Sequence, residues 1–162
     1  MDVPGPVSAL PAIGTVPAPD PDLRIRRIIL ATDLSPTSSG AADQALQLAA
    51  DLRAELLVVS VIDPDPSLAS GATLARMDQR RAVREVAAQS LVVRGRISGV
   101  QVRFLVWEGE PGPAIVEAAG SEAADLVVVG SHGRGRVGRM VLGSVSDHVV
   151  RHAPCPVLIV RG

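Results

Sequence analysis

Residues 127–150 read VVVGSHGRGRVGRMVLGSVSDHVV, an apolar run followed directly by a segment rich in glycine and arginine. The apolar run has the length and composition of a buried strand, and a helix is predicted to start near Ser144. Glycines between a strand and a helix let the backbone turn sharply and come close to another group, because no Cβ stands in the way. The stretch therefore predicts a strand, a ligand-contacting loop and a helix in succession.

The same alternation of short apolar runs and longer helical patterns extends through the chain from residue 25. Strands are predicted at residues 25–31, 56–62, 100–106, 125–130 and 157–160. Helices are predicted from the cap and first position Ser35-Pro36 to Leu52, at about 71–94, from EGEPGP to about Gly120, and from about Ser144. Nearly continuous apolar strands that alternate with helices predict an α/β fold with a parallel sheet covered on both faces. The alternation within 100–106 predicts that this strand has one polar face.

The first 22 residues differ in composition from the rest of the chain. They contain six prolines and no basic residue, and residues 3–19 are uncharged. Five prolines and two glycines interrupt that run and no basic region precedes it, so neither a membrane span nor a signal peptide is predicted. We expect a disordered or extended Pro-rich tail at residues 1–22 and a single domain at residues 23–162.

Composition argues against several classes of function. A net charge of -1 is not that of a protein that binds bulk nucleic acid. Phe104 and Trp107 are the only aromatic residues, so the stacking platforms of single-strand binders are missing. The 16 basic residues are all arginine, which excludes the lysine-dependent P-loop of common NTPases. One cysteine is typical of a reducing compartment and predicts a cytoplasmic protein.

Three loops are expected at the edge of the sheet where the strands end: residues 32–35 (TDLS), residues 63–66 (DPDP) and the glycine-rich loop. Ligands of open parallel sheets bind beyond this edge. Within the last loop, GRGRVG at 133–138 matches the dinucleotide pattern G-x-G-x-x-G. That pattern belongs in the first strand-to-helix turn, with an acidic residue about 20 positions further on. Here it follows the fourth strand and residues 148–162 contain no Asp or Glu, so the match is interpreted as a coincidence.

A wider spacing, Gly130-x2-Gly133-x9-Gly143-Ser144, gives a better interpretation. The first pair lets the backbone leave the strand sharply, and the second pair lies where the last helix begins. SVSD at 144–147 has the form of a capping box, so the first helical turn is expected to present amide groups and the positive end of the helix dipole. A phosphate between these anchors would meet amides from both sides, with three arginines on the intervening loop, Arg134, Arg136 and Arg139.

The chain resembles the universal stress protein family over about residues 25–161, through ILATDLS, LLVVSVID and VVVGSHGRGRVGRMVLGSVSDHVVRHAPCPVLIV. The glycine and serine spacing is similar to the signature of the ATP-binding branch of that family. The resemblance implies a flavodoxin-like, or adenine nucleotide alpha hydrolase-like, open sheet of five parallel strands in the order 3-2-1-4-5, with helices on both faces. It also implies ATP at the carboxyl edge and a homodimer formed through the C-terminal strand, Val157 to Val160.

The resemblance further implies a nucleotide site residue by residue. The implied contacts are Ala31, Asp33, Val61, Val129, Gly130, Gly133, Arg134, Gly143, Ser144 and Val145. Asp33 and Val61 would contact adenine, largely through main-chain groups, and Ala31 and Gly130 would lie near the ribose. The residues from 133 to 145 in this set would hold the phosphates. A divalent ion, Mg or Mn, would be bound mainly by the phosphates, because no His, Asp or Glu cluster has ligand spacing.

Each of these residues also has a purely structural explanation. Gly130 and Gly133 are consistent with a tight turn alone, Ser144 with an N-cap, Asp33 with a turn, and the loop arginines with solvated charge. Ser60 and Ala31 also stand where the family frequently has His and Pro, which affects the details of the adenine and ribose contacts.

Three functions are weighed on this basis. The first is an ATP-binding stress-response or signalling module that reports nucleotide occupancy to an unidentified protein partner. The second is a weak ATPase or nucleotide-transfer enzyme, and the third is a scaffold without a ligand. Phosphoryl transfer needs a water-positioning base and a fixed cation. The sequence assembles no such set, so no catalytic residue is assigned and at most slow ATP hydrolysis is expected. The glycine and serine anchors argue against the scaffold.

Overall fold

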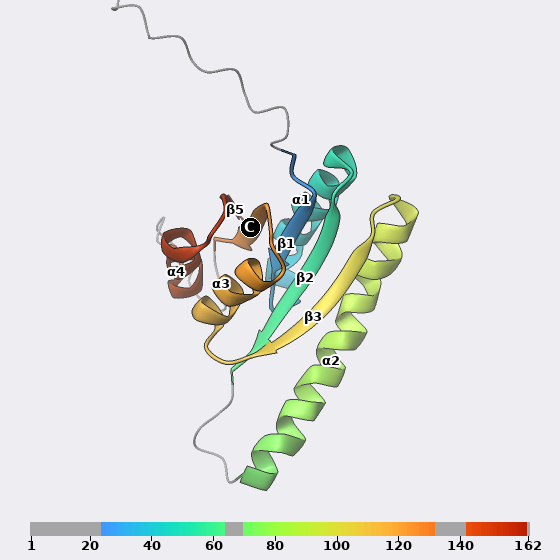
Figure 1. Cartoon of the computed structure of the whole chain (residues 1–162). Helices are drawn as coiled ribbons and strands as arrows, with labels where there is room; N and C mark the ends of the chain where they lie inside the picture. The colour runs from blue at the N-terminus through green and yellow to red at the C-terminus, as the bar shows by residue number, and fades with distance from the viewer. Residues whose placement is uncertain (1–23, 64–69, 132–141, 162) are drawn as a thin grey trace, which may run out of the picture.

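The computed structural model describes residues 24–63, 70–131 and 142–161. Within these ranges the sheet has five parallel strands in the order β3-β2-β1-β4-β5 (Figure 1). The strands are β1 (Arg27–Ala31), β2 (Glu55–Ile62), β3 (Val102–Glu108), β4 (Leu126–Gly130) and β5 (Val157–Val160). The predicted open sheet of order 3-2-1-4-5 is confirmed. The expected tail at residues 1–22 lies outside the described residues.

Helices cover both faces of this sheet. The helices α1 (Ser39–Leu52) and α2 (Ser70–Ile97) pack on one face, and α3 (Pro111–Ser121) and α4 (Ser144–His152) pack on the other (Figure 1). A 3-10 turn, η1 (Pro36–Ser38), precedes α1 and has Ser35 as its N-cap. The predicted cap and first position at Ser35-Pro36 therefore belong to this turn, and α1 itself starts at Ser39.

Successive side chains of the central strands point into two separate cores. Ile28 and Leu30 of β1 pack in the core beneath α1 and α2, together with Leu91 of α2. Ile29 packs in the core beneath α3 and α4, together with Ile115 of α3. Each fully buried Leu, Ile or Val contributes roughly 1.5–3 kcal/mol to folding. Strands that are apolar on both sides thus hold both helix layers to one sheet.

Strand β3 differs from its prediction, which placed it at 100–106 with one polar face. It runs from Val102 to Glu108, and Phe104 packs against the core beneath α1 and α2. Leu105 and Trp107 pack against the core on the opposite face. The predicted polar face is therefore limited to the start of the strand, where Arg103 is exposed, because Leu105 and Trp107 further along the same face are covered.

Helix α2 lies close against β3 because Gly95 has no side chain. A Cβ at Gly95 would meet Val102 Cγ2 at 2.2 Å, so any larger residue would push the helix away from the strand. The opposite side of α2 carries exposed apolar residues, including Val83, Val86 and Ile97. Contact with the sheet therefore uses only one side of this long helix.

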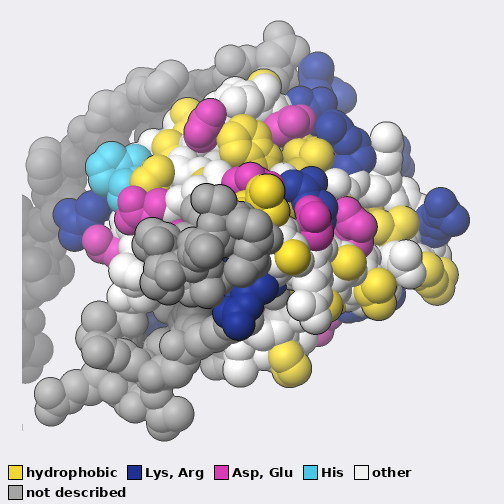
Figure 2. Space-filling model, turned by 90° about the horizontal axis from the view of Figure 1, so that it is seen from below, with side chains coloured by type: hydrophobic (Ala, Val, Ile, Leu, Met, Phe, Trp, Pro, Cys, Tyr) yellow, Lys and Arg dark blue, Asp and Glu magenta, His cyan; other side chains and the backbone are white. Residues whose placement is uncertain are grey.

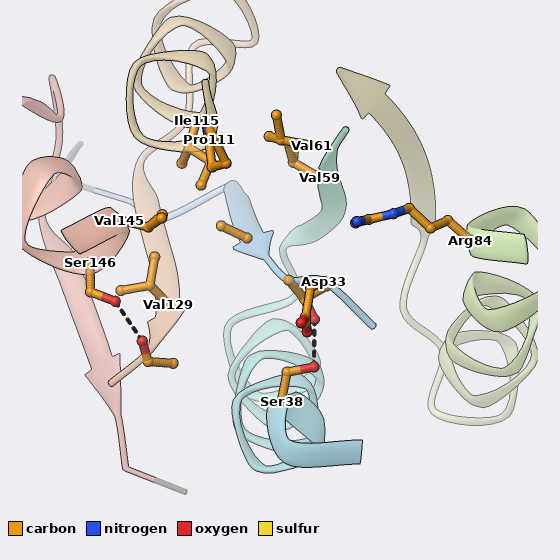
Figure 3. A pocket seen from close by; sticks show the side chains of 13 residues that line it. Asp33, Ser38, Val59, Val61, Arg84, Pro111, Ile115, Val129, Val145 and Ser146 are labelled. Carbon is orange, nitrogen blue, oxygen red and sulfur yellow. Dashed lines mark hydrogen bonds between the residues drawn. The ribbon is translucent and has the colours of Figure 1, made fainter. Parts of the chain in front are cut away.

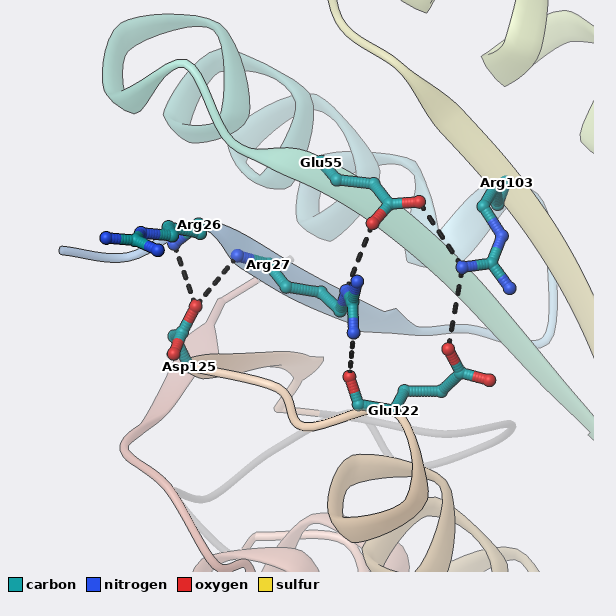
Figure 4. Close-up of polar contacts among 6 residues, drawn as sticks. All are labelled: Arg26, Arg27, Glu55, Arg103, Glu122 and Asp125. Carbon is teal, nitrogen blue, oxygen red and sulfur yellow. Dashed lines mark hydrogen bonds and ion pairs between the residues drawn. The ribbon is translucent and has the colours of Figure 1, made fainter.

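The amino ends of the strands are joined by charged groups, here called the amino-edge cluster (Figure 4). Its members are Arg26, Arg27, Glu55, Arg103, Glu122 and Asp125. Glu55 is paired with Arg27 at 3.0 Å and with Arg103 at 3.4 Å. Asp125 Oδ2 accepts hydrogen bonds from the backbone amides of Arg26 and Arg27 at 2.8 and 2.9 Å. The cluster thereby connects β1, β2, β3 and the segment before β4.

Candidate functional site

The end of β4 and the start of α4 are held together at the carboxyl edge of the sheet. The Gly143 amide donates a hydrogen bond to the Ser131 carbonyl at 3.2 Å, and the Ser146 hydroxyl donates to the Gly130 carbonyl at 2.7 Å. The Ser131 amide in turn donates to the Val160 carbonyl at 2.8 Å. The two predicted anchors, Gly130 and Gly143, are therefore brought together although they are far apart in the sequence.

The first turn of α4 differs from the predicted capping box. The N-cap is Gly143, and no side chain makes a capping hydrogen bond. Ser144 is thus the first helical residue, and Asp147 lies one position too far along to complete the box. Asp147 instead accepts a hydrogen bond from Arg151 Nε at 2.9 Å. This bond is the main reason why the pKa of Asp147 lies below its ordinary value.

The N-terminus of α4 is nevertheless suited to an anion. A helix leaves its first amides without intrahelical acceptors, and here these are the amides of Ser144, Val145 and Ser146. The first backbone bond within the helix runs from the Asp147 amide to the Gly143 carbonyl at 2.9 Å. The Gly143 amide is already bonded to Ser131, so it is the following residues that can donate to a phosphate.

A pocket lies next to this helix end, at the carboxyl edge of the sheet (Figure 3). Six of the predicted site residues line it: Ala31, Asp33, Val61, Val129, Gly130 and Val145. Its walls are largely apolar, with Val59 and Val61 of β2 facing Pro111 and Ile115 of α3. Apolar walls with a few polar groups are typical of small-molecule sites. The register places Ala31 beside both Val59 and Val129, so the pocket spans three adjacent strands.

The loop after β1 is fixed by its own polar side chains. Asp33 Oδ1 accepts a hydrogen bond from the Ser35 amide at 3.0 Å, and Thr32 Oγ1 accepts one from the Leu34 amide at 2.9 Å. The Thr32 hydroxyl also donates to Ser38 Oγ at 2.8 Å. Asp33 is therefore a turn-former that also lines the pocket, and the two roles are compatible.

The remaining predicted residues fall into two groups. Gly143 and Ser144 adjoin Val145 but are not among the described residues that line the pocket. Gly133 and Arg134 lie outside the described residues, as do Arg136 and Arg139. The structure thus places six of the predicted positions around one pocket and two more at the adjoining start of α4.

Sequence reasoning missed several residues that line the pocket, among them Thr32, Ser38, Arg84, Ile115 and Ser146. Arg84 could have been found from the helical period of α2. It precedes the buried residues Ala88 and Leu91 by four and seven positions, which puts an arginine on the inward side of the helix. The others carry no such signal, because hydroxyl residues in turns and apolar residues in helices are common.

Charges at this edge are mixed in sign. Figure 2 shows the face at the carboxyl ends of the strands, where arginine and carboxylate side chains are interspersed with apolar ones. Among the described residues, no group of three or more His, Cys, Asp or Glu side chains is placed to hold a metal ion. None of the helices in the described ranges is both long enough and apolar enough to cross a membrane.

A five-stranded parallel sheet of this order defines a flavodoxin-like α/β protein, and its pocket lies at the carboxyl edge, where open parallel sheets bind their ligands. The model of the universal stress protein family matches residues 24–161, and the chain belongs to this family.

Individual relatives agree with this assignment. A universal stress protein from Thermus aquaticus is 38% identical over 138 residues, which cover 84% of this chain and 98% of the relative. A universal stress protein from Methanocaldococcus jannaschii is 32% identical over 139 residues, covering 84% of this chain and 82% of the relative. Among solved structures, a universal stress protein in complex with cAMP is 28% identical with a TM-score of 0.65. That match covers 85% of this chain and 98% of the solved one.

Proposed function

We propose that this protein binds ATP at the carboxyl edge of its sheet and acts as a nucleotide-dependent module in stress response or signalling. The observation that carries the proposal is the hydrogen bond from the Ser146 hydroxyl to the Gly130 carbonyl. It holds the N-terminus of α4 beside a pocket with apolar walls. An anionic group is favoured at the helix end, and a flat apolar ring is favoured between the walls. A nucleotide combines both groups. The solved relative in complex with cAMP supports the same class of ligand.

The orientation of the nucleotide follows from the positions of the helix end, which favours the phosphates, and of the apolar walls, which favour the base. The phosphates would accept hydrogen bonds from the amides of Ser144 and Val145 and from the Ser144 hydroxyl. The ribose would lie over Ala31, Val129 and Gly130, and the base would lie towards Val61 on β2. In this proposal Gly133 and Arg134 approach the phosphates from the loop between the anchors. A divalent ion such as Mg or Mn would be held mainly by the phosphates.

The second candidate, a weak ATPase, has less support. A hydrolase needs a base that positions the attacking water. Asp33 is the carboxylate that lines the described pocket, and its Oδ1 is engaged by the Ser35 amide. We therefore assign no catalytic residue, and the proposal is that nucleotide occupancy, rather than turnover, is the signal that an unidentified protein partner receives.

The test is to denature freshly purified protein and to identify the released nucleotide by chromatography. Calorimetric titration of ATP, ADP, AMP and cAMP into nucleotide-free protein then ranks the ligands. Recovered ATP, or preferential ATP binding, supports the proposal. ADP that accumulates from fresh ATP would favour the enzyme instead. Protein that carries no nucleotide and binds none of the four ligands would refute both.

The proposal includes a homodimer formed through β5 and a cytoplasmic location. Strand β5 pairs with β4 on one side, and all four of its residues are only partly buried. An edge strand with apolar, half-exposed side chains favours pairing with a second copy. The location rests on the presence of one cysteine.

Light scattering across the micromolar range tests the assembly, with twice the monomer mass expected. Leu158→Arg should shift the mass towards the monomer or cause aggregation. Since Leu158 also packs against the core beneath α1 and α2, circular dichroism must accompany this variant. A wild-type protein that stays monomeric throughout would rule out the homodimer.

A further inference from the structure

Arginines at positions 80, 81 and 84 of α2 contact residues at the carboxyl ends of β2 and β3, and of these only Arg84 lines the pocket. Arg80 donates to the Asp63 carbonyl at 3.2 Å, and Arg81 pairs with Glu108 at 2.7 Å. Arg80 thus contacts the residue that follows β2, and Arg81 contacts the last residue of β3. Arg84, one turn further along, donates to the hydroxyl of Ser60 and lines the pocket. In Figure 3 its side chain extends from α2 towards Val59 and Val61.

The partner of Arg84 fixes where its charge lies. Ser60 belongs to β2 and is fully buried, so its hydroxyl is a fixed acceptor inside the fold. A guanidinium is planar, always charged and rich in donors, and its position on a rigid helix limits how far it can move. Arg84 therefore places a permanent cation at the β2 end of the pocket, across the strands from α4.

The pocket lining contains both kinds of charged hydrogen-bonding group. Asp33 contributes a carboxylate, which only accepts, and Arg84 contributes a guanidinium, which only donates. The base of an adenine nucleotide has the matching requirements, because its exocyclic amine donates and its ring nitrogens accept. The flat face of a guanidinium also stacks favourably against an aromatic ring.

We infer that Arg84 contacts the nucleobase and donates a hydrogen bond to one of its ring nitrogens. This inference rests on the proposed function, since it requires a nucleotide with its base directed towards β2. It assigns to α2 a part in ligand binding, in addition to its part in the core. Ser60 then acts as a positioning residue, because it orients the guanidinium without touching the ligand.

The experiment compares ATP and adenosine by calorimetric titration in the wild-type protein and in Arg84→Met. Loss of a base contact should weaken both ligands by a similar factor of about tenfold, because adenosine retains the base. Arg80→Met is the matched control, since it removes the same charge from the same helix at a residue outside the pocket lining. It should change neither affinity by more than about twofold. Arg84→Lys, which keeps the charge without the planar fork, should lose less than Arg84→Met and serves if the latter does not fold.

Deaza analogues of adenosine, each of which lacks one ring nitrogen, can identify the nitrogen that accepts the hydrogen bond. In the wild-type protein, one of 1-deaza-, 3-deaza- and 7-deazaadenosine should bind about tenfold more weakly than adenosine, and in Arg84→Met this difference should disappear. If Arg84→Met weakens ATP but not adenosine, the guanidinium contacts phosphate and the inference is wrong. Unchanged affinity for both ligands, or a deaza difference that persists in Arg84→Met, also overturns it. Failure of the proposed function is recognised separately, because the wild-type protein would then bind neither ATP nor adenosine.

Discussion

The two edges of the sheet are built from different chemistry. At the amino edge, the carboxylates of Glu55 and Asp125 are paired with arginines and backbone amides from neighbouring segments (Figure 4). At the carboxyl edge, the contacts that hold the chain around the pocket are made by hydroxyls and backbone groups, such as Thr32 to Ser38 and Ser146 to Gly130 (Figure 3). The charges of the amino edge are thus paired with one another, whereas at the carboxyl edge helix-end amides and a guanidinium held by a buried hydroxyl lie beside a pocket.

This difference suggests that the amino edge of the sheet contributes to stability and that the carboxyl edge contributes to ligand binding. Ion pairs that are made within the folded chain contribute to the free energy of unfolding. Amides at the start of α4 are expected to gain their partners when a phosphate binds. Substitutions at the amino edge should therefore change unfolding, and substitutions at the carboxyl edge should change nucleotide affinity.

The largest effect is expected for Glu55→Ala in the amino-edge cluster. The Glu55 side chain is 17% exposed and its carboxylate is shared by Arg27 and Arg103, so its loss leaves two arginines without this partner. We expect the free energy of unfolding to fall by about 2 kcal/mol, measured by urea unfolding, with ATP affinity unchanged.

The control for this prediction lies at the opposite edge. Glu108 pairs with Arg81, but the two side chains are 50% and 44% exposed. An exposed pair contributes little, so Glu108→Ala should cost less than about 1 kcal/mol. Equal costs for the two substitutions would mean that the amino-edge cluster has no special part in stability.

The next effect concerns Gly143→Val at the carboxyl edge. Gly143 has φ −61° and ψ 155°, a backbone conformation open to any residue, so the variant should fold. Its side chain would stand beside the amides that are proposed to hold phosphate. We expect ATP to bind at least about tenfold more weakly, which is about 1.4 kcal/mol, by calorimetric titration.

A matched control is Gly120→Val in α3, where an added Cβ would meet no atom within 4 Å. It should leave ATP affinity as it is. Gly130→Val is expected to act in the same direction as Gly143→Val. If folded Gly143→Val binds ATP as tightly as the wild-type protein does, the glycines serve only the turn.

Much of the fold could be predicted from the sequence, because buried strands leave a strong signal. Residues 157–160 were predicted as a strand with the bounds that β5 has, and 56–62 differs from β2 only at Glu55. These runs are apolar on both sides, and helical patterns of different period separate them. The strand order came from the family resemblance and is confirmed by the pairing of β1 with both β2 and β4.

The parts that could not be predicted depend on contacts between distant segments. The capping box at 144–147 was wrong because α4 begins one residue earlier than a Ser144 cap requires, with Gly143 as the N-cap and its amide bonded to Ser131. The predicted polar face of β3 extends only to Arg103, because Leu105 and Trp107 on the same face pack against the core beneath α3 and α4. Arg84 was missed because the pocket is approached from α2, a helix that the motifs did not include.

A smaller effect is expected for Ser144→Ala. If the Ser144 hydroxyl donates to a phosphate near the protein surface, its loss should weaken ATP about fivefold, or roughly 1 kcal/mol. Adenosine, which has no phosphate, should bind within twofold of its wild-type affinity. Added salt should likewise weaken ATP more than adenosine, because it screens the contacts to the phosphates.

The same calorimetric titrations measure these changes, with Ser121→Ala as an exposed serine control in α3. Equal losses for ATP and adenosine in Ser144→Ala would place the contact on the nucleoside and would reverse the proposed direction of the ligand.

The smallest effect returns to the amino edge, where Cys155 precedes β5. Burial raises the pKa of the Cys155 thiol above its ordinary value, and the negative charge of Asp125 raises it further. Only the thiolate is alkylated, so at pH 8 the protein should react more slowly with iodoacetamide than free glutathione does, and the midpoint of its rate against pH should lie higher. Since the chain has one cysteine, the measured rate reports this site alone.

Asp125→Asn keeps an acceptor for the amides of Arg26 and Arg27 but removes the charge. It should lower the midpoint only slightly, because burial is the larger cause. A wild-type midpoint at or below that of glutathione would show that this end of the sheet is open to water. Packing against the core beneath α3 and α4 would then not shield Cys155, and this prediction for the amino edge would be wrong.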